Sequence, residues 1–289
     1  MGKSLIKPKS SYSENCIIIP TKHAKSQAIM QNFWDILGAR VIEYVVDTDR
    51  LGTFSGEVER QGTALECAKR KCEWSLEMLG DKAEYLLASE GSFGPHPLIP
   101  FMPCDHEILY FIDKNRNFHL HLSLLSEKTN YRMQEVDSLE ELQLFASKAK
   151  FPSHALILRP MNIDNPIIFK GLNKKESLED AYEEAQKLSN KVWIETDMRA
   201  HMNPSRMNVI KQLAGDLARR LKTHCPSCSI PGWGQIQIEK GLECNGCGLK
   251  TQMVKHEIFG CTKCEYKEIK ERSDGIKYAD PGQCQYCNP

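Results

Sequence analysis

The chain has 289 residues, of which 41% are hydrophobic, so it is long enough for two domains with a sizeable core and too apolar for global disorder. Lysine plus arginine and aspartate plus glutamate both number 38, and this zero net charge argues against a protein that mainly coats nucleic acid. Residues 1–15 are polar and are predicted to form a flexible leader rather than a secretory signal. No apolar stretch has the length needed to cross a bilayer, so we expect a soluble, cytoplasmic protein without a membrane partner.

Beyond the leader, short apolar runs alternate with amphipathic segments. The expected elements are a strand at 16–20, a helix at 21–38, a strand at 39–46, a helix at 63–80, a strand at 84–90 and a hairpin around 113–117. This alternation predicts an α/β domain over residues 16–150, built on a mixed sheet with flanking helices. Ligands in such folds bind beyond the carboxyl ends of the strands, so candidate site residues are expected in the loops there.

The loop after the first expected strand, PTKHAK, is rich in cations. Thr21 suits an N-cap, which would put Lys22, His23 and Lys25 in the first helical turn, where the helix dipole favours negative charge instead. A phosphate bound among these side chains and the free N–H groups would explain them, and the alternative is a solvated basic turn. On the first interpretation Thr21, Lys22 and His23 bind substrate and Lys25 is catalytic.

The third expected strand enters the stretch LASEGSFGPHP and is predicted to end at Glu90. Gly91 and Gly94 would let the backbone approach a ligand closely, and the following prolines would stiffen the loop. A carboxylate in this place can hold a magnesium ion or orient a water molecule. Glu90 is therefore a candidate catalytic and magnesium-binding residue, and Ser92 a candidate substrate-binding residue.

The stretch between the second strand and the second helix, VVDTDRLGTFSGEVERQGT, carries four acids: Asp47, Asp49, Glu57 and Glu59. They form either a metal-binding loop, with Asp49 catalytic and Glu59 a magnesium ligand, or a plain polar loop. Further on, Thr63 and Glu66 have the spacing of a capping box, which we favour over a catalytic role for Glu66.

The pattern T-K-H-x-K, then G-T-x-L-E-x-A-x-x-K-C, then A-S-E-G-S resembles the inosine/xanthosine triphosphate pyrophosphatase superfamily over about residues 16–125. The resemblance implies a magnesium-dependent reaction on nucleoside triphosphates. The matched positions are Thr21 and Lys25 for the phosphate loop, Glu59 and Glu66 near the acidic helix start, and Glu90 for the metal-binding carboxylate. This chain departs from the family at His23, where an Asn is usual, and at Ser89-Glu90, where the family has two acids; the downstream base-recognition motifs are not evident.

Residues 151–222 are expected to form an α/β extension that ends in a long helix opened by Pro204. The apolar run VWIE leads into the polar stretch TDMRAHMNPSR, a second concentration of reactive side-chain types after a strand. Arg199 and Arg206 can clamp a phosphate or carboxylate of the substrate through two hydrogen bonds each. The alternative is that both arginines form ion pairs that tie the helix to the tail of the chain.

Eight of the twelve cysteines follow residue 224 in four C-x-x-C pairs: Cys225 and Cys228, Cys244 and Cys247, Cys261 and Cys264, Cys284 and Cys287. Two such pairs on either side of a spacer are typical of a four-thiolate zinc site, and residues 223–289 are too poor in apolar side chains to fold without metal. A reducing cytoplasm argues against disulfides. We expect two structural zinc ions in a double zinc ribbon, with the pairs joined in chain order or in a cross-braced arrangement.

The tail is poorly suited to nucleic acid. Residues 225–289 contain eight basic and eight acidic side chains, and each four-thiolate zinc site adds about two negative charges. Docking of a protein partner through the ribbons is therefore favoured over binding of nucleic acid.

Over its whole length, through SEGSFGPHP, ETDMRAHMNPSRM and the four C-x-x-C pairs, the chain resembles a bacterial family of unknown function, which implies an architecture but no activity. Our leading hypothesis is a magnesium-dependent nucleotide phosphohydrolase or pyrophosphatase with a zinc-binding tail. The alternative is a non-enzymatic adaptor that binds a protein or nucleic-acid partner through its zinc ribbons.

Overall fold

The computed structural model describes residues 10–46, 60–161, 164 and 167–289. The chain divides into two compact units, Met1–Leu217 and Ala218–Pro289, and each is described by itself. Among the described residues no helix combines the length and apolar content that crossing a membrane requires.

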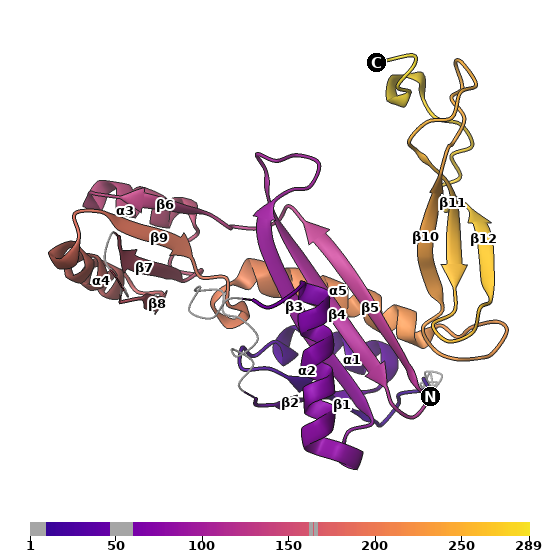
Figure 1. Ribbon diagram of the computed structural model, residues 1–289, viewed down its shortest axis with the longest axis horizontal. Helices are drawn as coiled ribbons and strands as arrows, with labels where there is room; N and C mark the ends of the chain where they lie inside the picture. Colours follow the sequence, from indigo (N-terminus) through magenta and orange to yellow (C-terminus); the bar gives the residue numbers. More distant parts are fainter. Residues whose placement is uncertain (1–9, 47–59, 162–163, 165–166) are drawn as a thin grey trace, which may run out of the picture. The chain divides into compact units, whose positions relative to one another are not determined.

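The first unit contains a five-stranded mixed sheet with the order β2-β1-β3-β4-β5 (Figure 1). Its strands are β1 (Cys16–Pro20), β2 (Arg40–Tyr44), β3 (Tyr85–Pro95), β4 (Pro103–Asp113) and β5 (Phe118–Ser126). Strand β1 runs parallel to both β2 and β3, whereas β3, β4 and β5 form an antiparallel meander. The predicted α/β class, with its mixed sheet, is confirmed.

Two helices flank the parallel part of this sheet. Helix α2 (Ala64–Leu79), continued by a 3-10 turn at Gly80–Lys82, packs its Ala68 and Cys72 against one face of the sheet. The capping box that the sequence indicates at its start is present, with Thr63 and Glu66 bonded to each other's backbone N–H.

Helix α1 (Ser26–Leu37) ends at Gly38, as predicted, in the left-handed conformation that suits glycine. Its start was predicted wrongly: the N-cap is Lys25, not Thr21. Ala24 adopts a φ of 50°, which interrupts the helix, and the Thr21 N–H extends the β1–β2 ladder by bonding to the Tyr44 carbonyl.

Strand β3 is longer than predicted. It does not end at Glu90 but continues to Pro95, because β4 provides a ladder partner for every residue from Tyr85 to Pro95. Gly91 and Gly94 are therefore strand residues rather than parts of a loop. Beyond the end of β1 no described strand pairs with this open edge of β3, and Lys25 of the loop that follows β1 donates to the Ser89 carbonyl there.

A second sheet in the same unit has the order β6-β9-β7-β8, with antiparallel pairs throughout. Its strands are β6 (Met133–Val136), β7 (Leu156–Pro160), β8 (Phe169–Leu172) and β9 (Val192–Thr196), and helices α3 (Leu139–Lys148) and α4 (Lys175–Leu188) cover it with a common apolar core. The predicted boundary at residue 150 falls inside this arrangement, since β6 and α3 precede it. A 3-10 turn at Ala200–Met202 then leads to helix α5 (Pro204–Lys222), which begins at Pro204 as predicted.

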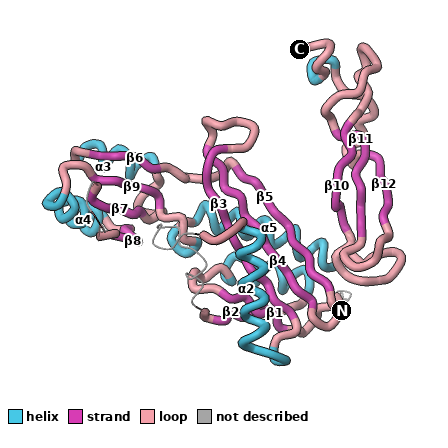
Figure 2. Tube along the Cα trace, in the orientation of Figure 1, coloured by secondary structure: helices cyan, strands magenta, loops and turns pink. Residues whose placement is uncertain are grey.

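The second unit is built on a three-stranded antiparallel sheet of β10 (Gly234–Lys240), β11 (Val254–Gly260) and β12 (Lys267–Glu271). Loops and one 3-10 turn at Pro281–Gln283 make up most of the rest (Figure 2). Beyond the strands its buried apolar residues are few, and several of them are cysteines. A core this small does not hold a fold together without additional cross-links.

Candidate metal centres and a buried cationic site

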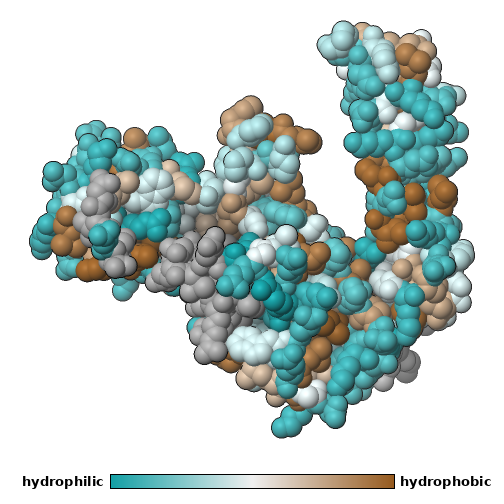
Figure 3. Space-filling model, viewed as in Figure 1, coloured by the Kyte–Doolittle hydropathy of each residue, from teal (hydrophilic) through white to brown (hydrophobic). Residues whose placement is uncertain are grey.

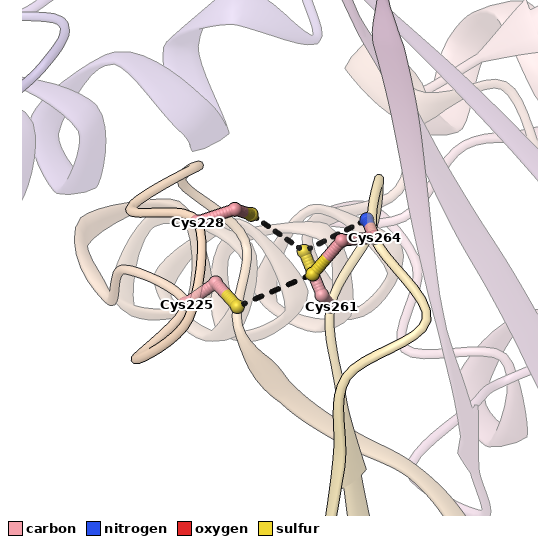
Figure 4. A group of neighbouring side chains, drawn as sticks. All are labelled: Cys225, Cys228, Cys261 and Cys264. Atoms are coloured by element: carbon pink, nitrogen blue, oxygen red, sulfur yellow. Dashed lines mark hydrogen bonds between the residues drawn. The ribbon is translucent and has the colours of Figure 1, made fainter.

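The eight cysteines of the tail form two groups of four. Cys225, Cys228, Cys261 and Cys264 make the first group (Figure 4). Cys244, Cys247, Cys284 and Cys287 make the second group. Within each group all sulfur atoms lie within 4.8 Å of one another.

The spacing of the sulfur atoms fits a zinc ion. Two Sγ–Sγ distances are 3.7 and 3.5 Å in the first group, and two are 3.8 and 3.7 Å in the second. A tetrahedron with Zn–S bonds of about 2.3 Å has sulfur–sulfur edges of about 3.8 Å. Backbone N–H groups of Cys247 and Gly246 lower the pKa of Cys244 to about 7, which favours the thiolate that zinc binds. Both groups have four thiolate ligands, as structural zinc sites do.

The joining of the pairs in chain order, one of the two arrangements considered above, is wrong. The first pair joins the third and the second joins the fourth, which is the cross-braced arrangement. The sheet explains this. Gly234 at the start of β10 pairs with Gly260 at the end of β11, so the cysteines just before β10 and just after β11 meet at one end. The Cys244 segment, between β10 and β11, lies at the other end and is bridged to Ala279 near the fourth pair.

A cluster of buried charges occupies the first unit where β1 ends beside β3. The chain passes from β1 to β2 on one side of β1 and then returns to β3 on its other side, and a reversal of strand order of this kind is a common ligand site in α/β folds. Glu90 projects from β3 toward α2, with its side chain only 7% exposed, and forms an ion pair with the buried Lys71 of α2. The guanidinium of Arg60 lies 3.7 Å from the same carboxylate. Lys25 donates to the carbonyl of Ser89 at 2.7 Å, at the open edge of β3.

The charges in this cluster perturb one another. Burial works to raise the pKa of Glu90, but the charges of Lys71 and Lys25 hold it below its ordinary value. Burial and the charge of Arg206 lower the pKa of Lys25 to about 7, against the opposing effect of Glu90. We call Lys25, Arg60, Lys71 and Glu90 the cationic site, since three cations surround one carboxylate.

The opposite face of the same strands carries a second set of buried charges. Residues 105 and 107 of β4 lie opposite residues 93 and 91 of β3, on the face away from α2. There Arg206 of α5 donates to Glu107 and to the Met198 carbonyl, each at 2.5 Å. Gly91 is required at this point, because a Cβ would lie 2.5 Å from both the Arg206 and the Glu107 side chains.

Asp105 is fully buried beside Glu107, and neither of its carboxylate oxygens accepts a hydrogen bond from any described residue. Burial, and then the charge of Glu107, raise the pKa of Asp105 to about 8. The side chain is therefore mostly neutral at pH 7, in a form that can donate a proton to a neighbouring oxygen. The hydroxyl of Ser89, on the same face, also has no hydrogen-bond partner among the described residues.

Residues 71–289 match a family that is defined as a domain of unknown function, DUF6671. The chain belongs to this family. No curated protein and no solved structure matches it. The region that DUF6671 covers includes Lys71, Glu90, Arg206 and all eight zinc-site cysteines, whereas the loop after β1 precedes it.

The structure brings some of the predicted site residues together and separates others. Lys25, Glu90 and Ser92 gather around the open part of β3, where the Ser92 hydroxyl accepts from Arg60 at 2.7 Å. Thr21 is buried, and its hydroxyl accepts from the N–H of His23 at 3.1 Å, while the Lys22 side chain is exposed.

The anion predicted at the start of α1 is supplied in part by the protein, because the Glu43 carboxylate accepts from the Ser26 N–H at 3.3 Å. The ring of His23 stacks on that of His201, with centroids 5.1 Å apart, and this contact joins the loop after β1 to the turn before α5. Asp49 and Glu59 lie outside the described residues.

Arg199 and Arg206 are both ion-paired within the first unit. Arg199 donates through Nε and a terminal nitrogen to Asp197, at 3.0 and 2.6 Å, and Arg206 pairs with Glu107. Neither partner lies in the tail, to which the ion-pairing alternative had assigned them.

Sequence reasoning missed Lys71, Arg60, Asp105 and Glu107. Lys71 shares a helical stripe with the buried Cys67 and Ser75, so a lysine on an otherwise buried face was the available signal. Asp105 and Glu107 alternate in step with the apolar residues that follow them in β4, which indicates an inward-facing carboxyl pair. Arg60 follows the acidic loop directly and carried no comparable signal.

Proposed function

We propose that the first unit binds a phosphorylated small molecule, such as a nucleotide, at the cationic site and hydrolyses a bond to its phosphate. The observation that carries the proposal is the composition of this site: Lys25, Arg60 and Lys71 are grouped around one carboxylate, Glu90, at the carboxyl end of β1. Among the described residues, Arg60, Lys71 and a partly charged Lys25 carry more positive charge than the Glu90 carboxylate offsets, and a phosphate would neutralise this excess.

The state of Lys25 supports an anionic ligand. Its amine is almost completely buried, and in the free protein its pKa lies near 7, so part of the population is neutral. A bound phosphate would favour the charged form and raise this pKa. Anion binding above pH 7 is therefore expected to take up a proton, and the affinity for sulfate, which does not titrate in this range, is expected to fall as the pH rises from 6 to 9.

Each charged residue of the site has a role in this proposal. Lys25, Lys71 and Arg60 neutralise the phosphate oxygens, which lowers the barrier to attack by water on phosphorus. The phosphate competes with Glu90 for Lys71 and Arg60, and the released carboxylate then orients the attacking water. Asp105, although burial raises its pKa to about 8, lies on the other face of the same strands and has no role in this reaction.

A magnesium ion held by protein side chains alone does not fit the described residues. The two cysteine groups are their only clusters of three or more metal-binding side chains, and Glu90 is surrounded by cations instead of further acids. The predicted ligand Glu59 lies outside the described residues. The proposed reaction therefore uses no magnesium ion, and adding or omitting magnesium in the assay tests this point.

The hydrolysis is tested with zinc-loaded, full-length protein on a panel of nucleoside triphosphates, inosine and xanthosine forms included, with and without magnesium. We expect release of phosphate or pyrophosphate from at least one substrate, and a loss of about 100-fold or more in Lys71→Met and Glu90→Gln. The matched control is Lys69→Met, which removes an exposed lysine two residues away on α2. Equal rates in all variants, or no product from any substrate, would exclude the proposed reaction.

A second candidate function is docking of a protein partner through the zinc-binding unit. Ile236, Ile258 and Ile269 share one face of its three-stranded sheet; Ile258 is paired with Ile269, and Ile236 lies over Gly260. Residues Ile236 and Ile269 are 44% and 64% exposed. Figure 3 shows apolar surface on this unit between more polar regions. Such a stripe is suited to an apolar protein surface and not to a phosphate backbone.

The docking candidate is tested by crosslinking of the full-length protein in cells of its source, followed by binding measurements with the purified partner. A change of Ile236 and Ile269 to Ser is expected to weaken binding at least tenfold, whereas Tyr278→Ser, an exposed site outside the stripe, should leave it unchanged. For both candidate functions, a reducing compartment such as the cytoplasm would keep the eight thiols available for zinc.

A further inference from the structure

A cavity of about 300 Å³ lies beside the cationic site in the first unit. It is lined by Phe93, Tyr131, Met133 and Met198, together with the polar side chains of Arg60 and Ser92. The rings of Phe93 and Tyr131 lie 5.8 Å apart and are tilted by 31°. Aromatic and thioether groups around a cavity of this size form a surface on which a flat ring can stack.

Arg60 connects this cavity to the cationic site. It donates to the Ser92 hydroxyl at 2.7 Å and to the Gly91 carbonyl at 2.5 Å, and the same guanidinium lies 3.7 Å from Glu90. One side chain therefore lines the cavity and also belongs to the group that would hold a phosphate. A single ligand with a charged end and a flat end can occupy both places.

Glu195 of β9 gives the cavity a fixed hydrogen-bond acceptor. Its Oε2 accepts from the indole N–H of Trp193 at 3.0 Å and from Arg159 at 3.4 Å, so the carboxylate is held in place. Burial, and then the charge of Glu195, raise the pKa of Tyr131, which places the two side chains in the same environment. A ring that carries N–H groups at its edge would pair with this carboxylate.

We propose that this cavity takes the base of a nucleotide whose phosphate lies at the cationic site. The inference rests on the proposed binding of a phosphate at the cationic site, and it adds a place for the base of the same ligand. The base stacks on Tyr131 and Phe93, and Glu195 accepts a hydrogen bond from its edge.

The test measures binding by calorimetry, with zinc-loaded full-length protein and two kinds of probe: ribose 5-phosphate, and the four ribonucleoside 5′-monophosphates. At least one nucleotide is expected to bind about tenfold more tightly than ribose 5-phosphate, since stacking of one base on an aromatic side chain contributes a factor of this size. Tyr131→Ala should remove this gain and leave the affinity for ribose 5-phosphate unchanged. Tyr131→Phe, which keeps the ring, should retain the gain.

Glu195→Gln provides a second variant that does not depend on the tyrosine. An amide both donates and accepts, so the order of preference among the four bases is expected to change. Equal affinity for all five probes would overturn the inference. It would also be overturned if Tyr131→Ala still bound a nucleotide more tightly than ribose 5-phosphate and Glu195→Gln kept the same order of preference among the four bases. Circular dichroism of each variant shows whether it is folded.

The outcomes separate this inference from the proposed hydrolysis. Base-dependent binding without turnover of any triphosphate would support the cavity as a base site and exclude the reaction. Turnover with no preference of any nucleotide over ribose 5-phosphate would support the reaction and exclude the base site. Absence of binding by every probe would overturn the base site, and the reaction would then be judged by product release from triphosphates alone.

Discussion

The two units of this protein are stabilised in opposite ways. The first unit has a large apolar core that extends over both of its sheets, and it buries a group of charged side chains at the edge of β1 and β3. The second unit has few buried apolar residues and two groups of four cysteines instead. The second unit therefore has two groups of sulfur atoms that could hold metal ions where the first unit has hydrophobic packing. The first unit alone has a core large enough to keep charged side chains buried. A ligand site built from buried charges is therefore expected in the first unit.

The largest effect is expected from the removal of zinc ligands, because a structural zinc ion contributes about 10 kcal/mol or more to the folding of a small domain. The variant Cys228→Ser/Cys261→Ser alters one site and should leave one zinc ion per chain. Cys228→Ser/Cys247→Ser alters both sites and should leave none. Metal content after dialysis, measured by a colorimetric chelator assay, distinguishes the two. If the pairs were joined in chain order, Cys228→Ser/Cys261→Ser would leave no zinc ion and Cys228→Ser/Cys247→Ser would leave one.

The next largest effect concerns the buried pair of Arg206 and Glu107, whose side chains are almost fully inaccessible to solvent. Arg206→Met leaves the Glu107 carboxylate buried without its partner, and we expect a loss of about 3–5 kcal/mol in the free energy of unfolding of the first unit. Arg159→Met, which removes a more exposed partner of Glu195, should cost less than about 1 kcal/mol. Urea unfolding measures the free energy of unfolding of both variants. Similar losses in the two would contradict the larger contribution expected of the buried pair.

Asp105 should give the first unit a characteristic pH dependence. Its pKa is about 8 in the folded protein and near the ordinary value of 3.8 when unfolded, so the folded state binds the proton more tightly. The stability that this difference contributes is complete below pH 4 and is lost as the pH rises to about 8. Asp105→Asn keeps the shape of the neutral acid, and we expect a higher melting temperature than that of the native protein at pH 8 and a similar one at pH 4.

The control for Asp105→Asn is the exposed Asp81→Asn, which is bonded to Lys114 at the surface. Its effect on the melting temperature should be small at both pH values. The same pH-dependent gain in both variants would show that overall charge, and not the burial of Asp105, produces it.

The smallest effect is expected at the start of α2. Thr63→Ala removes the hydroxyl that accepts from the Glu66 N–H at 3.2 Å, and N-cap replacements of this kind cost about 1 kcal/mol. Thermal unfolding of the first unit should show a correspondingly small decrease, and zinc content should stay at two ions per chain. A loss of zinc in this variant would contradict an effect confined to the first unit.

Elements whose patterns are local were predicted well from the sequence. Gly38 ends α1, Pro204 begins α5 and the Thr63 capping box is present, because each depends on side-chain and backbone contacts within one helical turn. The end of β3 was predicted wrongly because it depends on β4, which supplies hydrogen-bond partners as far as Pro95 from another part of the chain. Lys71 was missed because its partner, Glu90, follows it by nineteen residues and meets it only across a helix and a sheet.

The sequence by itself determined that the tail carries four C-x-x-C pairs of the kind that can hold metal ions, and it determined the α/β class from the alternation of apolar runs. Only the tertiary structure decided which pairs share a metal ion and which charges surround Glu90. The reason is that the C-x-x-C spacing along the chain is enough to place the two sulfur atoms of one pair side by side as metal ligands. Strand order and register fix which pairs meet, and they are set by contacts between distant residues.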